Sequence, residues 1–156
     1  TAGVEFNVRK HNLYRAPEGD LILHDKFESK VAWLPLFPGM SLDVLERVLY
    51  WDELRGVILG TYGSGNAPDN MKFKTLLKYA QGRGVTIVNI TQCGHGGVKQ
   101  EMYATSLMLA DCGVISGGDM TTEAALIKLM MLLGETDDSE AIRKGILMNL
   151  RGERTN

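Results

Sequence analysis

Polar residues gather in three glycine-rich loops, and each loop directly follows a short apolar run. The loops span residues 62–69, 91–99 and 116–121, and they carry amide, hydroxyl, thiol and imidazole groups. Asn66 stands out among these groups, because its amide has two hydrogen-bond donors and an acceptor. Groups of this kind can hold a small polar ligand. The alternative interpretation of residues 62–69 is a glycine corner that only reverses the chain.

The first of these loops departs from the known nucleotide-binding patterns. Pro68 replaces the third glycine of a dinucleotide fingerprint, and Pro has no backbone donor. The following apolar run contains Asn89, where an acidic residue would hold a ribose. The Gly-Lys-Ser/Thr sequence of a phosphate-binding loop is absent. We therefore predict that no nucleotide binds here.

Cys93 and His95 are the two residues best suited to metal or nucleophile chemistry. No second pair of ligands lies at zinc spacing, and no acidic residue supports the two as a nucleophile and base. Ser116 does not sit in a Gly-x-Ser-x-Gly elbow. The residues alone therefore predict no metal, no cofactor and no complete catalytic constellation. We expect Cys93 and Cys112 to be buried free thiols.

Composition excludes several classes of protein. With 17 Lys and Arg against 19 Asp and Glu, and no run of one sign, nothing indicates a nucleic acid or an anionic membrane as a partner. The apolar runs fall well short of the roughly 20 residues that cross a bilayer. A length of 156 residues is typical of one domain with a sizeable core.

The elements that position the three loops alternate between strands and helices. Short, mainly apolar runs predict buried strands at 31–37, where Pro35 interrupts the run, and at 56–61, 85–90 and 114–115. Periodicity predicts helices at 42–50, 70–81, 101–111, 123–133 and 139–150. Pro35 is expected at a strand end or a sheet edge. The pattern predicts an α/β fold, Rossmann-like or flavodoxin-like, with a four-stranded parallel sheet, helices on both faces and the three loops at its carboxyl edge.

Residues 1–30 are only weakly patterned. Val4, Phe6 and Val8 recur at period two, and Leu21–Leu23 follows a turn signal, which predicts two short strands or extended segments around a surface loop. The chain starts at Thr1 without a methionine, which indicates a piece of a longer protein. We interpret residues 1–30 as a linker that enters a domain at 31–156.

Seven motifs occur in an order that resembles a known family. They are Phe37-Pro-Gly39, Tyr62-Gly-Ser-Gly-Asn-Ala-Pro68, Val88-Asn-Ile-Thr-Gln-Cys93, Tyr103-Ala-Thr105, Gly113-Val-Ile-Ser-Gly-Gly-Asp-Met-Thr121 with Glu123-Ala124, Lys128-Leu129 and Asn149-Leu-Arg-Gly-Glu153. From about residue 31 to 153, the chain resembles the C-terminal domain of a cytosolic, type I L-asparaginase. Residues 1–30 would then lead from the N-terminal catalytic domain.

The resemblance implies hydrolysis of L-asparagine to L-aspartate and ammonia by a threonine nucleophile, without a cofactor. In this family the nucleophile lies in a Thr-Gly-Gly-Thr motif of the larger domain, and no Gly-Gly-Thr occurs here. We therefore expect no catalytic residue in this chain and no activity of the chain alone. The implied partners are the N-terminal catalytic domain and further copies in a cytoplasmic dimer or tetramer.

The resemblance also implies site residues. Asn66, with Gly65 and Ser64, would face the substrate across the dimer. Some bacterial members of the family have an effector site for asparagine, which here would use Cys93 and Tyr62. Those members carry arginine at the position of Gly60.

Two alternatives remain open. One is a stand-alone sensor of small amino acids, and the other is the related amidotransferase subunit that delivers ammonia to a charged tRNA. The neutral charge balance and the Gly-Asn-Ala-Pro sequence favour the asparaginase.

Overall fold

The computed structural model describes residues 19–98 and 104–155. The strands are β1 (Val31–Pro35), β2 (Gly56–Thr61), β3 (Thr86–Thr91) and β4 (Ile115–Ser116). The helices are α1 (Leu42–Leu49), α2 (Met71–Gly82), α3 (Ala104–Asp111), α4 (Thr122–Glu135) and α5 (Ser139–Leu147). In this part of the chain, no helix combines the length and the apolar character needed to span a membrane.

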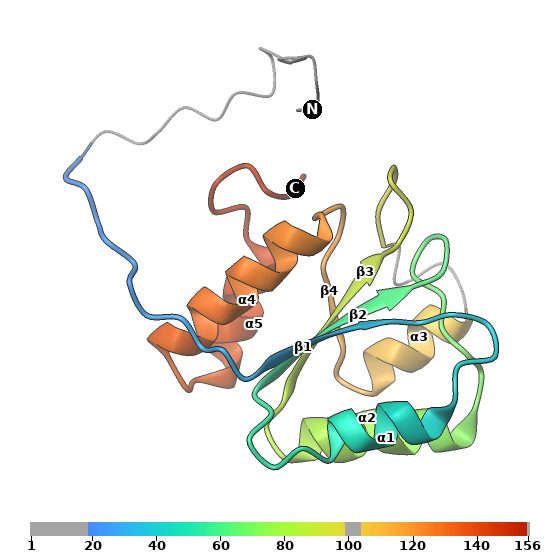
Figure 1. Cartoon of the computed structure of the whole chain (residues 1–156). Helices are drawn as coiled ribbons and strands as arrows, with labels where there is room; N and C mark the ends of the chain where they lie inside the picture. The colour runs from blue at the N-terminus through green and yellow to red at the C-terminus, as the bar shows by residue number, and fades with distance from the viewer. Residues whose placement is uncertain (1–18, 99–103, 156) are drawn as a thin grey trace, which may run out of the picture.

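The four strands form one parallel sheet in the order β1-β2-β3-β4. Since each crossover steps to the next strand in the same direction, α1, α2 and α3 lie on one face, and α4 and α5 cover the other (Figure 1). The predicted fold class is confirmed. The sequential order has no switch point, so the carboxyl edge is defined by the common direction of the strands alone.

Strand β2 is buried on both faces. Val57 and Leu59 pack into the cluster beneath α1, α2 and α3, whereas Ile58 packs against α4. All six residues of β2 are buried, which explains why its sequence is apolar without alternation.

Residues with local conformational preferences mark the ends of several elements. Ser41 caps α1, and Thr121 caps α4 by accepting a hydrogen bond from Ala124 N at 3.2 Å. Pro35 ends β1, which is an edge strand, as expected of a residue without a backbone donor.

Other boundaries differ from the prediction. Strands β3 and β4 extend one residue further, to Thr91 and Ser116, because Asn89 pairs with Ser116 and Thr91 with Thr61. The last helix ends at Leu147 rather than at 150, and the tail that follows is bound to α4. Part of the predicted helix at 101–111 lies outside the described residues.

Of the two predicted alternatives for the entry segment, strands or extended segments, the described residues 19–30 form no strand. Leu21, Ile22 and Leu23 are 95%, 74% and 77% exposed, and none of the four described strands pairs with them. Val4, Phe6 and Val8 lie outside the described residues.

Candidate functional site

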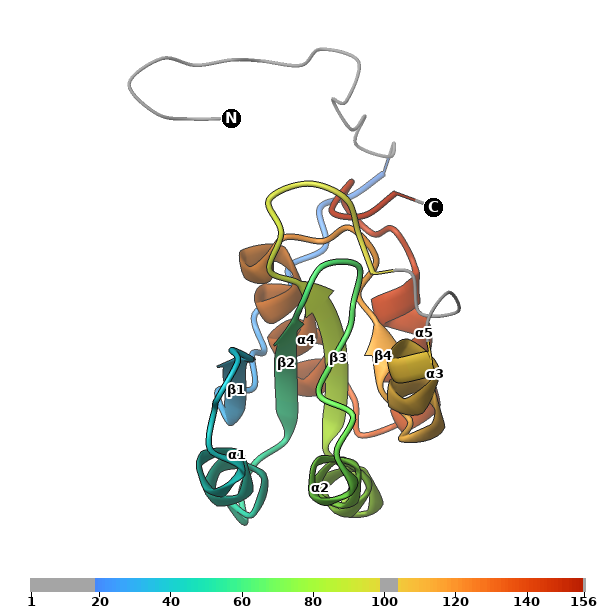
Figure 2. The same cartoon turned by 90° about the vertical axis from the view of Figure 1, so that its right-hand side faces the viewer.

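Loops from β2, β3 and β4 meet at the carboxyl edge of the sheet, as the parallel topology predicted (Figure 2). The Thr91 hydroxyl donates to the carbonyl of Gly63, which joins the first loop to β3. Gly117 N donates to the Asn89 carbonyl at 2.7 Å, and Val98 N donates to the Gly118 carbonyl at 2.8 Å. The three loops therefore form one hydrogen-bonded unit.

The loop of residues 62–66 is closed by a backbone bridge between Tyr62 and Asn66. Tyr62 N donates to the Asn66 carbonyl at 2.8 Å, and Asn66 N donates to the Tyr62 carbonyl at 2.9 Å. Between them the chain reverses through Gly63 and Gly65, whose φ values are +49° and +108°. Such angles strain most other residues, so these glycines allow a turn this tight.

Beneath this loop lies a fully buried polar pair, Thr61 and Asn89. The Thr61 hydroxyl donates to Asn89 Oδ1 at 2.6 Å and also lies 3.1 Å from the Ile90 carbonyl. Asn89 Nδ2 donates to the Gly65 carbonyl at 3.3 Å. We call these two residues the buried amide pair. The sequence singled out Asn89 only for lacking a negative charge, whereas the structure shows it supporting the glycine loop.

The predicted substrate-side residues lie together in this loop. Asn66 and Ser64 are half-buried, Gly65 is buried, and Tyr62 packs partly against the core. The loop therefore holds its polar side chains on a backbone fixed at both ends. This arrangement can orient an amide toward a small polar ligand.

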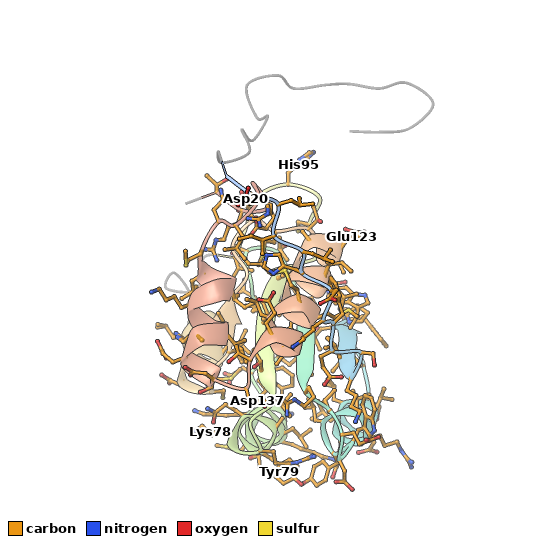
Figure 3. The ribbon with its side chains drawn as sticks, turned by 90° about the vertical axis from the view of Figure 1, so that its left-hand side faces the viewer. Asp20, Lys78, Tyr79, His95, Glu123 and Asp137 are labelled. Carbon is orange, nitrogen blue, oxygen red and sulfur yellow. The ribbon has the colours of Figure 1, made fainter. Side chains whose placement is uncertain are left out.

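Cys93 is exposed, which contradicts the predicted buried thiol. The loop that carries Cys93 runs beyond the sheet edge, and the backbone N of Cys93 donates to the Thr91 hydroxyl at 3.0 Å. His95 is exposed at the tip of the same loop, far from Lys78 and Tyr79 at the opposite end of the molecule (Figure 3). Cys112 is buried as predicted, and burial raises the pKa of its thiol. The described residues contain no group of three or more His, Cys, Asp and Glu that could bind a metal.

Gly60 leaves no space for a side chain. A Cβ atom at this position would lie 2.3 Å from Cη2 of Trp33. The Gly60 carbonyl also accepts hydrogen bonds from Leu36 N at 2.8 Å and Gln92 Nε2 at 2.9 Å. An arginine here would therefore require Trp33 to move.

The C-terminal tail is held by a contact that residue patterns did not predict. Lys128 Nζ and Glu153 Oε1 form an ion pair at 2.5 Å, with side chains only 4% and 13% exposed. Lys128 also donates to the carbonyls of Ile146 and Met148. We call the Lys128–Glu153 pair the ionic clamp. A lysine among the apolar residues of α4 was the signal that could have revealed it.

The tail continues from the ionic clamp to the loop after β4. Glu153 accepts hydrogen bonds from Leu150 N and Arg151 N; although burial would raise its pKa, Lys128 and these amides lower the pKa to about 2. Asp119 accepts bonds from the backbone and hydroxyl of Thr155; burial opposes them, yet the pKa of Asp119 stays below its ordinary value. The tail therefore forms one side of the carboxyl edge.

Comparison with known proteins identifies the family. The model of the Glutaminase/Asparaginase C-terminal domain matches residues 30–145. L-asparaginase 1 of Escherichia coli is 44% identical over 151 residues, which are 96% of this chain and 44% of that protein. The crystal structure of L-asparaginase I from Vibrio cholerae matches with a TM-score of 0.83 and 41% identity, covering 90% of this chain and 42% of that one.

A protein that is named for a different activity is also similar to this chain. A glutamyl-tRNA(Gln) amidotransferase subunit of Thermococcus kodakarensis is 36% identical over 138 residues, covering 88% of this chain and 31% of that protein. The chain thus spans less than half the length of these three proteins. It belongs to the glutaminase/asparaginase family, of which it represents the C-terminal domain.

Proposed function

We propose that the domain acts as part of an L-asparaginase that hydrolyses L-asparagine to L-aspartate and ammonia. It would supply one wall of the active site and a surface for subunit contact. The observation that carries this proposal is the fixed position of Asn66 in a loop at the carboxyl edge, in a chain 44% identical to a protein named L-asparaginase 1.

Within this proposal, Asn66 contacts the substrate in the active site of a neighbouring subunit. Its amide both donates and accepts, which suits a ligand with amino, carboxylate and amide groups. Ser64 and Gly65 would line the same wall. The bridge between Tyr62 and Asn66 supports this role, because a fixed backbone lowers the entropy lost when the side chain binds.

The reactive hydroxyl would come from an N-terminal catalytic domain, since the Gly-Gly-Thr sequence is absent from this chain. Residues 1–30 would link the two domains, and the family match beginning at residue 30 supports this boundary. Within this segment, His24 contacts Glu135 of α4, and Glu28 N donates to the Met130 carbonyl at 2.9 Å. We expect the chain alone to be inactive.

We further propose that the protein is a cytoplasmic homo-oligomer, a dimer or a tetramer. Support for subunit or domain contact comes from an apolar pocket between α4 and the tail, which is lined by Ala124, Ile127, Met131 and Leu150 and leaves Ile127 54% exposed. Monomers seldom leave such groups together without a partner. Sedimentation of the longer protein would test the oligomeric state.

The effector site implied at Cys93 and Tyr62 would lack a cation at position 60, because Trp33 fills the space beside Gly60. A carboxylate ligand is held best by a paired guanidinium. We therefore expect the reaction rate to depend hyperbolically on asparagine concentration. A sigmoidal curve that Cys93→Ala abolishes would contradict this expectation.

Two assays test the main proposal. The isolated chain, shown to be folded by circular dichroism, is expected to release no ammonia from asparagine. In the longer protein, Asn66→Ala should raise KM about tenfold through the loss of hydrogen bonds to a charged ligand. Ammonia release by the isolated chain, or unchanged kinetics of Asn66→Ala, would contradict the corresponding part of the proposal.

The tRNA-dependent amidotransferase is the second candidate, because the Thermococcus kodakarensis protein of that name is related over 138 residues. The balanced charge of this chain argues against a tRNA-binding surface. A sensor of free amino acids would bind asparagine without any upstream catalytic sequence. Ammonia release by the longer protein from free asparagine, with no tRNA present, distinguishes the asparaginase from both.

A further inference from the structure

We propose that the buried amide pair, Thr61 and Asn89, positions Asn66 for substrate binding. These two residues would not touch the substrate. They would act through the Gly65 backbone, which they hold from beneath. The inference rests on the proposed role of Asn66, and it adds two positioning residues to that role.

The first argument is connectivity. Thr61 donates to Asn89 at 2.6 Å, and Asn89 donates to the carbonyl of Gly65, the residue directly before Asn66. The backbone carbonyl of Asn89 also accepts from Gly117 N at 2.7 Å. Through its side chain and its backbone carbonyl, Asn89 therefore joins β2, the glycine loop and the loop after β4.

The second argument is the orientation of the Asn89 amide. With Oδ1 toward the Thr61 hydroxyl and Nδ2 toward the Gly65 carbonyl, each group faces a partner of the opposite kind. A flipped amide would set two oxygens, Oδ1 and the Gly65 carbonyl, against each other. The Gly65 carbonyl selects this orientation because it can only accept a hydrogen bond, and the Thr61 hydroxyl then donates its proton to Oδ1.

The third argument is crowding at Gly65. A Cβ atom there would lie 2.7 Å from Cγ1 of Val98 and 3.3 Å from Nδ2 of Asn89. Val98 and the Asn89 amide therefore both crowd the place where a side chain of residue 65 would begin. The direction in which Asn66 leaves the turn depends on these two contacts.

The fourth argument is placement along the strands. Val57, Leu59 and Ile87 lie on the same face of the sheet, earlier along their strands, and all are apolar core residues. The face becomes polar only where the loop begins. A buried amide stabilises a fold less than an apolar side chain of similar size, unless hydrogen bonds compensate for its loss of contact with water. We attribute the presence of Asn89 at this position to its hydrogen bond with the Gly65 carbonyl.

The test compares variants of the longer protein by asparagine kinetics. Thr61→Val keeps the shape of the side chain and removes the donor, so KM should rise about threefold to tenfold with less change in kcat, the effect of one misplaced hydrogen bond. Thr61→Ser keeps the hydroxyl and should restore KM. Ile87→Val, a buried change on the same face, is the matched control and should leave KM unchanged.

A double-mutant cycle separates positioning from general destabilisation. If Thr61 acts through Asn66, Thr61→Val should have no further effect on KM in the Asn66→Ala background. An effect of the same size in both backgrounds would overturn the inference. So would a wild-type KM for Thr61→Val alongside a raised KM for Asn66→Ala, and the proposed function would then survive.

Unchanged kinetics of Asn66→Ala would instead contradict the proposed role of Asn66 itself, and the inference with it. Should Thr61→Val fail to fold, Val98→Ala removes the other group that crowds Gly65 and leaves the buried amide pair intact. It should raise KM in the same direction. A folded Val98→Ala variant with wild-type KM would count against the proposal.

Discussion

Two buried polar contacts tie distant segments together in this domain, and they use different chemistry. The buried amide pair joins neighbouring strands β2 and β3 through neutral groups. The ionic clamp joins α4 to the C-terminal tail through opposite charges 2.5 Å apart. Both remove polar groups from water, and both are satisfied by backbone partners as well as by each other.

The difference lies in what happens when one partner is lost. An unpaired buried amide lowers the stability by the desolvation free energy of one polar group. An unpaired buried carboxylate lowers it by the larger desolvation free energy of a charge. The neutral pair also holds its geometry at any ordinary pH. We infer that a neutral pair suits the positioning of a ligand-facing loop, and that an ionic clamp suits the attachment of a tail.

The largest effect is expected when the ionic clamp loses its cation. Lys128→Met should lower the free energy of unfolding by about 3–5 kcal/mol, because Glu153 stays partly buried without its counter-charge. Chemical denaturation measures this loss. The double variant Lys128→Met with Glu153→Gln should recover part of the stability, and a single variant as stable as wild type would contradict the account.

The next effect separates two glycines of the same loop. Gly65→Ala should cost about 2–4 kcal/mol, since its φ is +108° and the new Cβ would lie 2.7 Å from Val98. Gly63→Ala should cost only about 1 kcal/mol, because its φ is +49° and nothing lies within 4 Å. Thermal unfolding measures both, and equal losses would show that crowding at Gly65 is unimportant.

Acid should distinguish the two contacts. Glu153 has a pKa of about 2 in the folded chain against an ordinary 4.5, so its contribution is complete above pH 4.5 and is lost as the pH falls toward 2. We expect a loss of about 2 kcal/mol over this window after allowance for solvent screening. Unfolding measured at a series of pH values checks this loss.

The control for the acid experiment is the double variant Lys128→Met with Glu153→Gln, whose stability should fall less over the same window. Asp119 also has a lowered pKa and contributes in the same direction at the bottom of the window. If the stability of the double variant falls with pH as much as that of the wild type, Glu153 is not the group responsible.

The smallest effect concerns an exposed ion pair of the same charge type as the clamp. Lys72 contacts Asp43 at 2.9 Å and Glu46 at 2.8 Å, but its side chain is 47% exposed. Water screens such pairs, so Lys72→Met should not change the melting temperature measurably. A drop comparable to that of Lys128→Met would show that burial is not what separates the two ion pairs.

The sequence predicted the fold well because its main signals are local. Buried parallel strands read as continuous apolar runs, and caps such as Ser41 and Thr121 mark helix starts by hydrogen bonds within a few residues. The loop of residues 62–66 was also predictable as a turn from its glycines. The sequence left strand and extended segment both open at Leu21–Leu23, and it was wrong at Cys93, where burial depends on the path of a loop.

The sequence by itself determined the order of the elements, the parallel sheet and the edge at which polar loops gather. These follow from hydrophobic period and turn chemistry, which act over short stretches of chain. Only the tertiary structure showed that Asn89 supports Gly65, that Trp33 fills the space beside Gly60, and that Lys128 binds Glu153. Those contacts join residues 24 to 27 positions apart, and no local pattern records which distant groups a fold brings together.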